Sequence, residues 1–148
     1  MINYIYNNEA IGVVAIYSVI KELEEIEYSK AMLILPLMLN DKLIKFLGRA
    51  NTKVRGIEEL IIKKGQVLTN FNEFYLEMLP ISINSLIILN EMQVIEIENG
   101  IIRIIKKEIK FDLDVSKRTN SMLKSVKGIC EILKIQSESL YLQLRVIL

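Results

Sequence analysis

The sequence predicts an α+β fold that is mostly α-helical. Glycine and proline are scarce, at six and two among 148 residues, which favours long regular elements over loops. Aliphatic residues dominate and recur at helical spacing in several segments. Two β-branched runs, Val94–Glu98 and Ile101–Ile105, flank Asn99-Gly100, which favours a tight hairpin because both turn positions need a positive φ. We therefore expect helices around one β-hairpin.

A helix followed at once by this hairpin predicts a winged-helix-like unit at about 66–107, flanked by N- and C-terminal helices. Pro80 stands just before the helix that precedes the hairpin, and Ser82 is its expected N-cap. The two-residue turn also sets the register of the strands. The expected cross-strand pairs are Ile95 with Ile104, Glu96 with Arg103 and Ile97 with Ile102.

The segments before this unit are expected to be helical. A first helix, capped by Asn7 or Asn8, would run from Ala10 to about Ile26, and its apolar residues on nearly every side predict a place at the centre of the domain or beneath a partner. Pro36 is expected to break the next apolar stretch. The further expected helices are Pro36 to about Phe46, Ile57–Lys64, Gln66–Leu79 and Ser82–Met92.

Two more helices are expected after the hairpin. An alternating stretch from Ile109 to Val115 is either a third strand or an extended linker. The chain is long enough for one core, so residues 1–148 are expected to form a single domain. The expected C-terminal helices run from a cap at Asp114 or Ser116 to about Leu133, and from a cap at Ser137 through Glu138–Leu148.

The net charge, the length of the apolar runs and the number of cysteines indicate where the protein is located and which classes of partner it lacks. The formal net charge is +1, so no overall field attracts the chain to nucleic acid or to anionic membranes. Apolar runs stay below the roughly 18 residues that span a bilayer, and the N-terminus lacks the basic segment of a signal peptide. A single cysteine precludes an internal disulfide and fits a reducing compartment. We expect a cytoplasmic protein without membrane association.

The sequence lacks the residues of common catalytic and metal sites. It contains no histidine, so it has neither the usual general base nor the commonest metal ligand. Cys130 lies on the apolar face of an expected helix, as inert core thiols do. Asp112 and Asp114 are expected to be solvated near a helix start, and no glycine-rich phosphate loop occurs. No catalytic, metal-binding or cofactor-binding residue is therefore expected, and the chain is not expected to be an enzyme.

A DNA-binding winged-helix transcriptional regulator is the alternative function. Its recognition helix would be Ser82–Met92, which contains no lysine or arginine, and the wing tip is acidic where phosphate contacts need cations. The cations that would support this alternative are Arg103, Lys106 and Lys107, on and after the second strand. We favour the interpretation that the unit contacts protein.

Four short features occur in series along the chain. They are Y-N-N-E-A at Tyr6–Ala10, L-I-L-P-L at Leu33–Leu37, L-P-I-S at Leu79–Ser82 and the hairpin that follows. In this order they cover nearly the whole chain, which resembles the small middle component of bacterial three-component ABC systems. The Lamassu anti-phage defence systems belong to this group.

The resemblance implies a non-catalytic accessory subunit of a hetero-oligomeric defence complex. Such a subunit would bridge an SMC-like ABC ATPase and a toxic effector such as a nuclease. It would help to hold the effector inactive until the ATPase senses foreign DNA, and it would touch DNA only within the assembly. An antitoxin-like inhibitor is a third hypothesis, which differs only in the partner. No residue role is carried over from the family.

The apolar surplus of the first helix and of the C-terminus fits a partner protein, and it fits an isoleucine-rich core equally well. We choose partner-binding residues from their expected exposure in three places: the polar connection Arg49–Gly56, which we call the basic connection, the wing with its helix, and the C-terminus. These residues are Arg49, Lys53 and Arg55, then Asn84, Ile87, Glu91 and Arg103, and finally Arg145 and Leu148.

Overall fold

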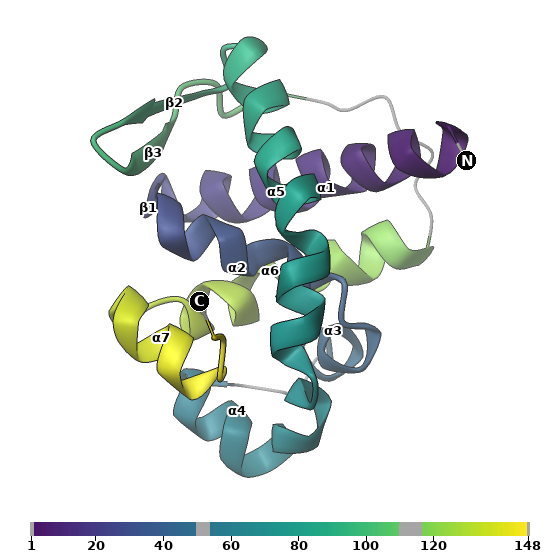
Figure 1. The fold of residues 1–148 in the computed structure, drawn as a ribbon, viewed down its shortest axis with the longest axis vertical. Helices are drawn as coiled ribbons and strands as arrows, with labels where there is room; N and C mark the ends of the chain where they lie inside the picture. Colours follow the sequence, from purple (N-terminus) through teal and green to yellow (C-terminus); the bar gives the residue numbers. More distant parts are fainter. Residues whose placement is uncertain (1, 50–53, 110–116, 148) are drawn as a thin grey trace.

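The computed structural model describes residues 2–49, 54–109 and 117–147, and in these ranges helices flank a small three-stranded antiparallel sheet (Figure 1). This confirms the predicted α+β, mostly helical class. The helices are α1 (Ile2–Leu23), α2 (Tyr28–Met38), α3 (Asp41–Leu47), α4 (Ile57–Lys64), the 3₁₀ helix η1 (Gly65–Leu68), α5 (Phe71–Glu91), α6 (Lys117–Ile132) and α7 (Ser137–Gln143). The strands are β1 (Glu25–Glu27), β2 (Ile95–Glu98) and β3 (Ile101–Ile104).

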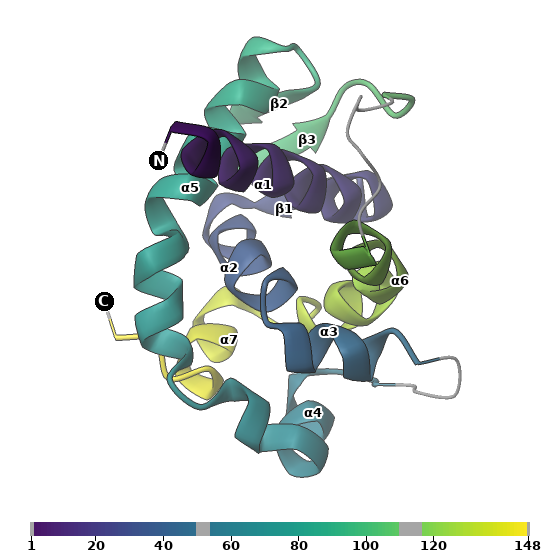
Figure 2. The ribbon, with the colours of Figure 1, turned by 90° about the vertical axis from the view of Figure 1, so that its right-hand side faces the viewer.

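The helix α2 lies at the centre of the molecule, next to the buried middle of the first helix. All residues from Ala31 to Met38 are buried, so this helix has no exposed face over most of its length. The helices α1, α5 and α6 pack around it, and α3 follows at its end (Figure 2). A helix that is apolar on every side gains most when it is enclosed by other helices. α1 is buried on all sides from Gly12 to Tyr17, while its end is exposed at Lys21 and Glu22.

Both prolines lie inside helices, contrary to the sequence prediction. Pro36 does not break the apolar segment but lies within α2, and Pro80 lies within a continuous α5 rather than between two helices. A proline inside a helix costs about 3 kcal/mol because it removes one backbone hydrogen bond and crowds the preceding turn. Burial of side chains on both sides of each proline offsets this cost, as in Tyr75 before Pro80 and Leu86 after it.

The hairpin forms with the predicted register. Ile95 pairs with Ile104, Glu96 with Arg103 and Ile97 with Ile102, and the turn residues Asn99 and Gly100 have φ of 53° and 75°. The third strand comes from an unexpected place, because β1 pairs with β3 and gives the order β1-β3-β2. Ile26, expected to end the first helix, instead lies in β1 opposite Ile102. Of the alternating stretch 109–115, only Ile109 is among the described residues.

Several expected helix ends were placed wrongly. Asn7 and Asn8 lie inside α1, which already begins at Ile2. Ser82 is a buried residue in the middle of α5 and caps nothing. The last helix ends at Gln143, because Arg145 adopts a positive φ of 58° that a helix cannot contain.

Other expected ends are confirmed or lie outside the described residues. The prediction for Ile57–Lys64 is confirmed, and Gly48 is the C-cap of α3 as expected. Ser137 is the first residue of α7 rather than its cap, and its hydroxyl is 2.6 Å from that of Ser29. The expected caps Asp114 and Ser116 of α6 lie outside the described residues.

The long helices α1 and α5 cross at a point without room for a side chain. A methyl group placed on Gly12 of α1 would lie 2.4 Å from the hydroxyl oxygen of Ser85 in α5. Ser82 and Ser85 are fully buried, and neither hydroxyl has a hydrogen-bond partner within the described part of the chain. Small residues on both helices therefore allow the close approach, at the cost of two unsatisfied hydroxyl groups.

We expect Gly12→Ala to lower the free energy of unfolding by about 1–3 kcal/mol, because the new methyl group forces the two helices apart. Ser85→Ala removes the clashing oxygen. The double variant should recover at least wild-type stability, since alanine also favours a helix over glycine by roughly 1 kcal/mol. Urea denaturation followed by circular dichroism measures all three variants. A Gly12→Ala variant as stable as the wild type would contradict the tight crossing.

Candidate functional site: an apolar helix face and a basic hollow

The outer face of α5 carries a stripe of exposed apolar side chains. Leu76, Ile83 and Ile87 are 50%, 37% and 49% exposed, and Pro80 is exposed between them. The spacings along the stripe are four, three and four residues, so all four lie on one side of the helix. Apolar residues at these intervals form the contact seam when two helices pack together. We call these four residues the α5 stripe.

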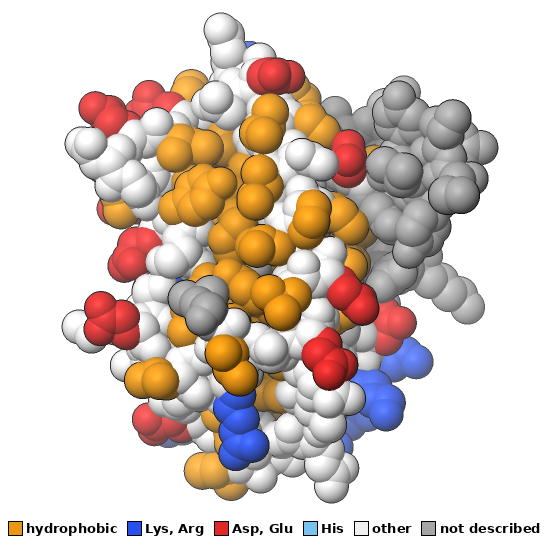
Figure 3. All heavy atoms as spheres, in the orientation of Figure 1, with side chains coloured by type: hydrophobic (Ala, Val, Ile, Leu, Met, Phe, Trp, Pro, Cys, Tyr) orange, Lys and Arg blue, Asp and Glu red, His pale blue; other side chains and the backbone are white. Residues whose placement is uncertain are grey.

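Acidic residues border the α5 stripe. α5 contains Glu73, Glu77 and Glu91 and no lysine or arginine. Figure 3 shows the apolar side chains running down this face of the molecule, with acidic side chains on either side. An apolar seam with acidic borders is complementary to a helix that has an apolar seam and basic borders.

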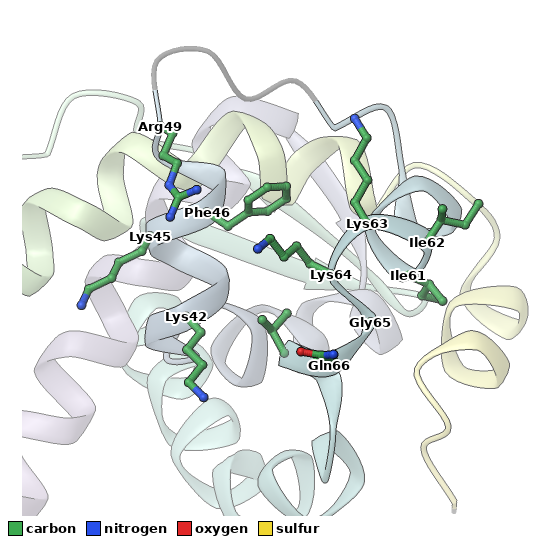
Figure 4. Close-up of a pocket in the computed structure, with 11 residues that line it drawn as sticks. Lys42, Lys45, Phe46, Arg49, Ile61, Ile62, Lys63, Lys64, Gly65 and Gln66 are labelled. Atoms are coloured by element: carbon green, nitrogen blue, oxygen red, sulfur yellow. The ribbon is translucent and has the colours of Figure 1, made fainter.

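A second surface feature is a hollow of about 590 Å³ between α3 and the α4–η1 segment. Five cations line it, and none of the described lining residues is acidic. They are Lys42, Lys45 and Arg49 from α3 and its end, with Lys63 and Lys64 from the end of α4. Figure 4 shows Lys64 and Arg49 turned toward Phe46 between the two elements, whereas Lys45 extends outward. We call this feature the basic hollow.

Intramolecular contacts engage two of these five cations. Lys63 forms an ion pair with Glu59 at 2.7 Å, and Glu59 also accepts a hydrogen bond from the backbone N–H of Arg55. These two bonds, that of Lys63 first, lower the pKa of the Glu59 carboxyl. The ammonium of Lys64 lies 5.5 Å from the centre of the Phe46 ring, a cation–π distance.

The cations of the hairpin are bound by the protein itself. Arg103 lies beside Glu96 in the sheet but forms its ion pair with Glu25 of β1, at 3.1 Å. Lys107 pairs with Glu24, and this hydrogen bond and charge lower the pKa of the Glu24 carboxyl. These residues, with Lys106, were the support for the DNA-binding alternative, and the Lys106 ammonium is 3.4 Å from the carbonyl oxygen of Met92. They therefore do not form a row of free cations along a wing.

The predicted partner-binding residues fall on different parts of the surface. Ile87 belongs to the α5 stripe, and Asn84 and Glu91 are exposed on the same helix, where the Asn84 amide donates to Glu9. Arg145 lines a separate hollow of about 650 Å³ between η1, the start of α5 and the C-terminal segment. In the basic connection, Arg49 lines the basic hollow, and Arg55, six residues later, is exposed. Lys53 and Leu148 lie outside the described residues.

Sequence reasoning named Ile87 and Arg49 but missed the other members of both surfaces. Lys42 and Lys45 are three residues apart, which places them on one side of α3, and this spacing was visible in the sequence. The α5 stripe was hidden because Pro80 was taken as a boundary. Lys63 and Lys64 approach α3 only in the folded chain, so no local pattern joins them to it.

A family model described as the ABC-three component (ABC-3C) system Middle Component 3 matches residues 2–147. The chain belongs to this family. No curated protein and no solved structure matches the chain. As a middle component of a multi-component ABC system, the protein has partner subunits. The resemblance to such middle components, inferred from four short features of the sequence, is thereby confirmed.

The described residues of this middle component contain no group of three His, Cys, Asp or Glu residues able to hold a metal ion. Within the same ranges, none of the helices has the length and apolar character needed to cross a membrane. Cys130 is 6% exposed, and burial, with smaller effects of Glu22 and Glu131, raises the pKa of its thiol to about 11. A thiol with this pKa is a poor nucleophile near neutral pH.

We expect Cys130 in the folded middle component to resist alkylation by iodoacetamide at pH 8 and to react fully in guanidinium chloride. Because folding raises the thiol pKa from about 9 to about 11, its contribution to stability is present below pH 9 and lost as the pH rises through 11. Mass spectrometry measures the alkylated fraction. Rapid alkylation of the native protein would contradict a buried, protonated thiol.

Proposed function

We propose that this middle component is a non-catalytic accessory subunit of a bacterial anti-phage defence complex of the Lamassu type. It bridges an SMC-like ABC ATPase and a toxic effector such as a nuclease, and it keeps the effector inactive until the ATPase is activated. The family match over residues 2–147 carries this proposal. The sequence, which has no histidine and one buried cysteine, agrees with a subunit that binds rather than catalyses.

We propose that one of the two partners binds to the α5 stripe. Its four apolar residues lie on a rigid helix that is held from behind by α1 and α2. Full burial of an exposed leucine or isoleucine contributes about 1.5–3 kcal/mol, and because Leu76, Ile83 and Ile87 are 50%, 37% and 49% exposed, each can still contribute up to about half of this. The acidic borders define the partner segment as an amphipathic helix whose apolar seam is edged by lysine or arginine.

We expect the chain to co-purify with both other components when the three neighbouring genes are expressed together and only one partner carries an affinity tag. Size-exclusion chromatography with light scattering then gives the mass of the complex. The effector should be more toxic to cells when this subunit is deleted. A subunit that elutes as a lone monomer beside an intact ATPase–effector complex would overturn the proposal.

We expect Ile83→Asp combined with Ile87→Asp to abolish co-purification with one partner, because two carboxylates would have to be buried without counter-charges. Leu123→Asp is the matched control. Leu123 is 48% exposed, much like Ile87, but lies on α6, across the molecule from α5 (Figure 2). Circular dichroism checks that both variants remain folded. Equal losses of binding in the two variants would show that the α5 stripe has no special role.

A further inference from the structure

We propose that the basic hollow binds the phosphate groups of a nucleic-acid backbone, without preference for base sequence. This inference is independent of the proposed bridging function. It assigns a ligand to a surface formed by α3 and by the end of α4, away from the hairpin (Figure 1). The argument depends on which cations are available, on how they are arranged and on which other groups accompany them.

The cations available for a ligand come mainly from α3. Three cations, Lys42, Lys45 and Arg49, form no ion pair with any described residue, and all three are exposed. Lys42 and Lys45, three residues apart, lie on one side of α3, and Arg49 follows just after the end of this helix. Three unpaired cations that line one hollow repel one another, so a bound polyanion relieves an existing repulsion.

The facing wall adds two further cations. The ammonium of Lys64, an exposed residue, lies 5.5 Å from the centre of the Phe46 ring on α3, so it reaches across the hollow toward the other wall. Lys63 is 53% exposed at its side chain and keeps its pairing with Glu59. On the α4 side it is Lys64 that extends toward α3, whereas Lys63 points away from it (Figure 4).

The cations of the hollow suit the phosphates of a nucleic-acid backbone. Four of the five are lysines, which bind phosphate as compact point charges, and the fifth, Arg49, has the planar fork that can bind phosphate by paired hydrogen bonds. Gln66 is the only amide side chain among the described lining residues, so bidentate reading of bases has little support. This set of groups contacts a backbone in any sequence.

The arrangement also favours a polymer over a single nucleotide. Sites for nucleotide phosphates usually present backbone N–H groups at a helix N-terminus. Here the lining residues come from the length of α3 and from the end of α4, and the cations are all side-chain groups. Binding therefore depends on side-chain cations spread along the hollow, as in proteins that follow a phosphate backbone.

The test is the binding of a short fluorescent DNA duplex of mixed sequence to the purified protein, measured by anisotropy at several salt concentrations. Lys42→Gln, Lys45→Gln and Arg49→Gln combined should weaken binding at least about tenfold and reduce the slope of log affinity against log salt by about 2–3, since each phosphate contact contributes about 0.9. These side chains make no ion pair among the described residues, so the fold should be retained.

The matched control combines Arg103→Gln, Lys106→Gln and Lys107→Gln. It also removes two lysines and one arginine, but from the hairpin region. Its duplex affinity and salt slope should equal those of the wild type. Equal weakening in the two triple variants would overturn the assignment to the basic hollow, as would the absence of duplex binding at low salt.

Two competitors separate the ligand classes. Unlabelled duplexes of different sequence should displace the probe equally well, whereas ATP and polyglutamate should displace it only at much higher concentrations. If ATP displaced the probe as effectively as unlabelled duplex at the same concentration of phosphate groups, the hollow would be a nucleotide site. Displacement by polyglutamate as effective as that by DNA would identify a site for an acidic protein segment, and either result would overturn the proposal.

Discussion

The crossing of α1 and α5 is the contact on which the surface of this protein depends. Gly12 leaves room for Ser85, so the two longest helices approach closely, and each helix buries one face against the other and against α2. α5 is held along its inner side on both sides of Pro80, which lets it remain one helix in spite of the missing backbone hydrogen bond. One continuous helix then presents one continuous apolar stripe to the outside.

The charges of the chain are segregated, although its formal net charge is only +1. Carboxylates border the α5 stripe, and cations gather at the basic hollow on α3 and α4. Because negative and positive charges lie on separate surfaces, each surface has its own electrostatic potential. A partner that binds one surface experiences this local potential rather than the net charge of the protein. A subunit that contacts more than one partner gains from two surfaces of different character, because the partners then do not compete for one place.

The small sheet illustrates how tertiary contacts change the meaning of a motif. In isolation, a hairpin that carries Arg103 and Lys107 could be a phosphate-binding wing. The strand β1 brings Glu24 and Glu25 against these two cations and engages them in ion pairs within the molecule. Exposed pairs of this kind add little stability, but they reduce the positive charge available to a nucleic acid.

Local rules of the sequence were sufficient for the fold class, the helix Ile57–Lys64 and the complete register of the hairpin, because a two-residue turn and a helix end are determined by neighbouring residues. Only the tertiary structure decided that α2 is central, that both prolines lie within helices, that β1 joins the sheet and that Lys64 of α4 extends toward α3. The reason is physical: each of these outcomes depends on free energy gained by packing against residues distant in sequence, and this gain exceeds the local preferences of the residues concerned.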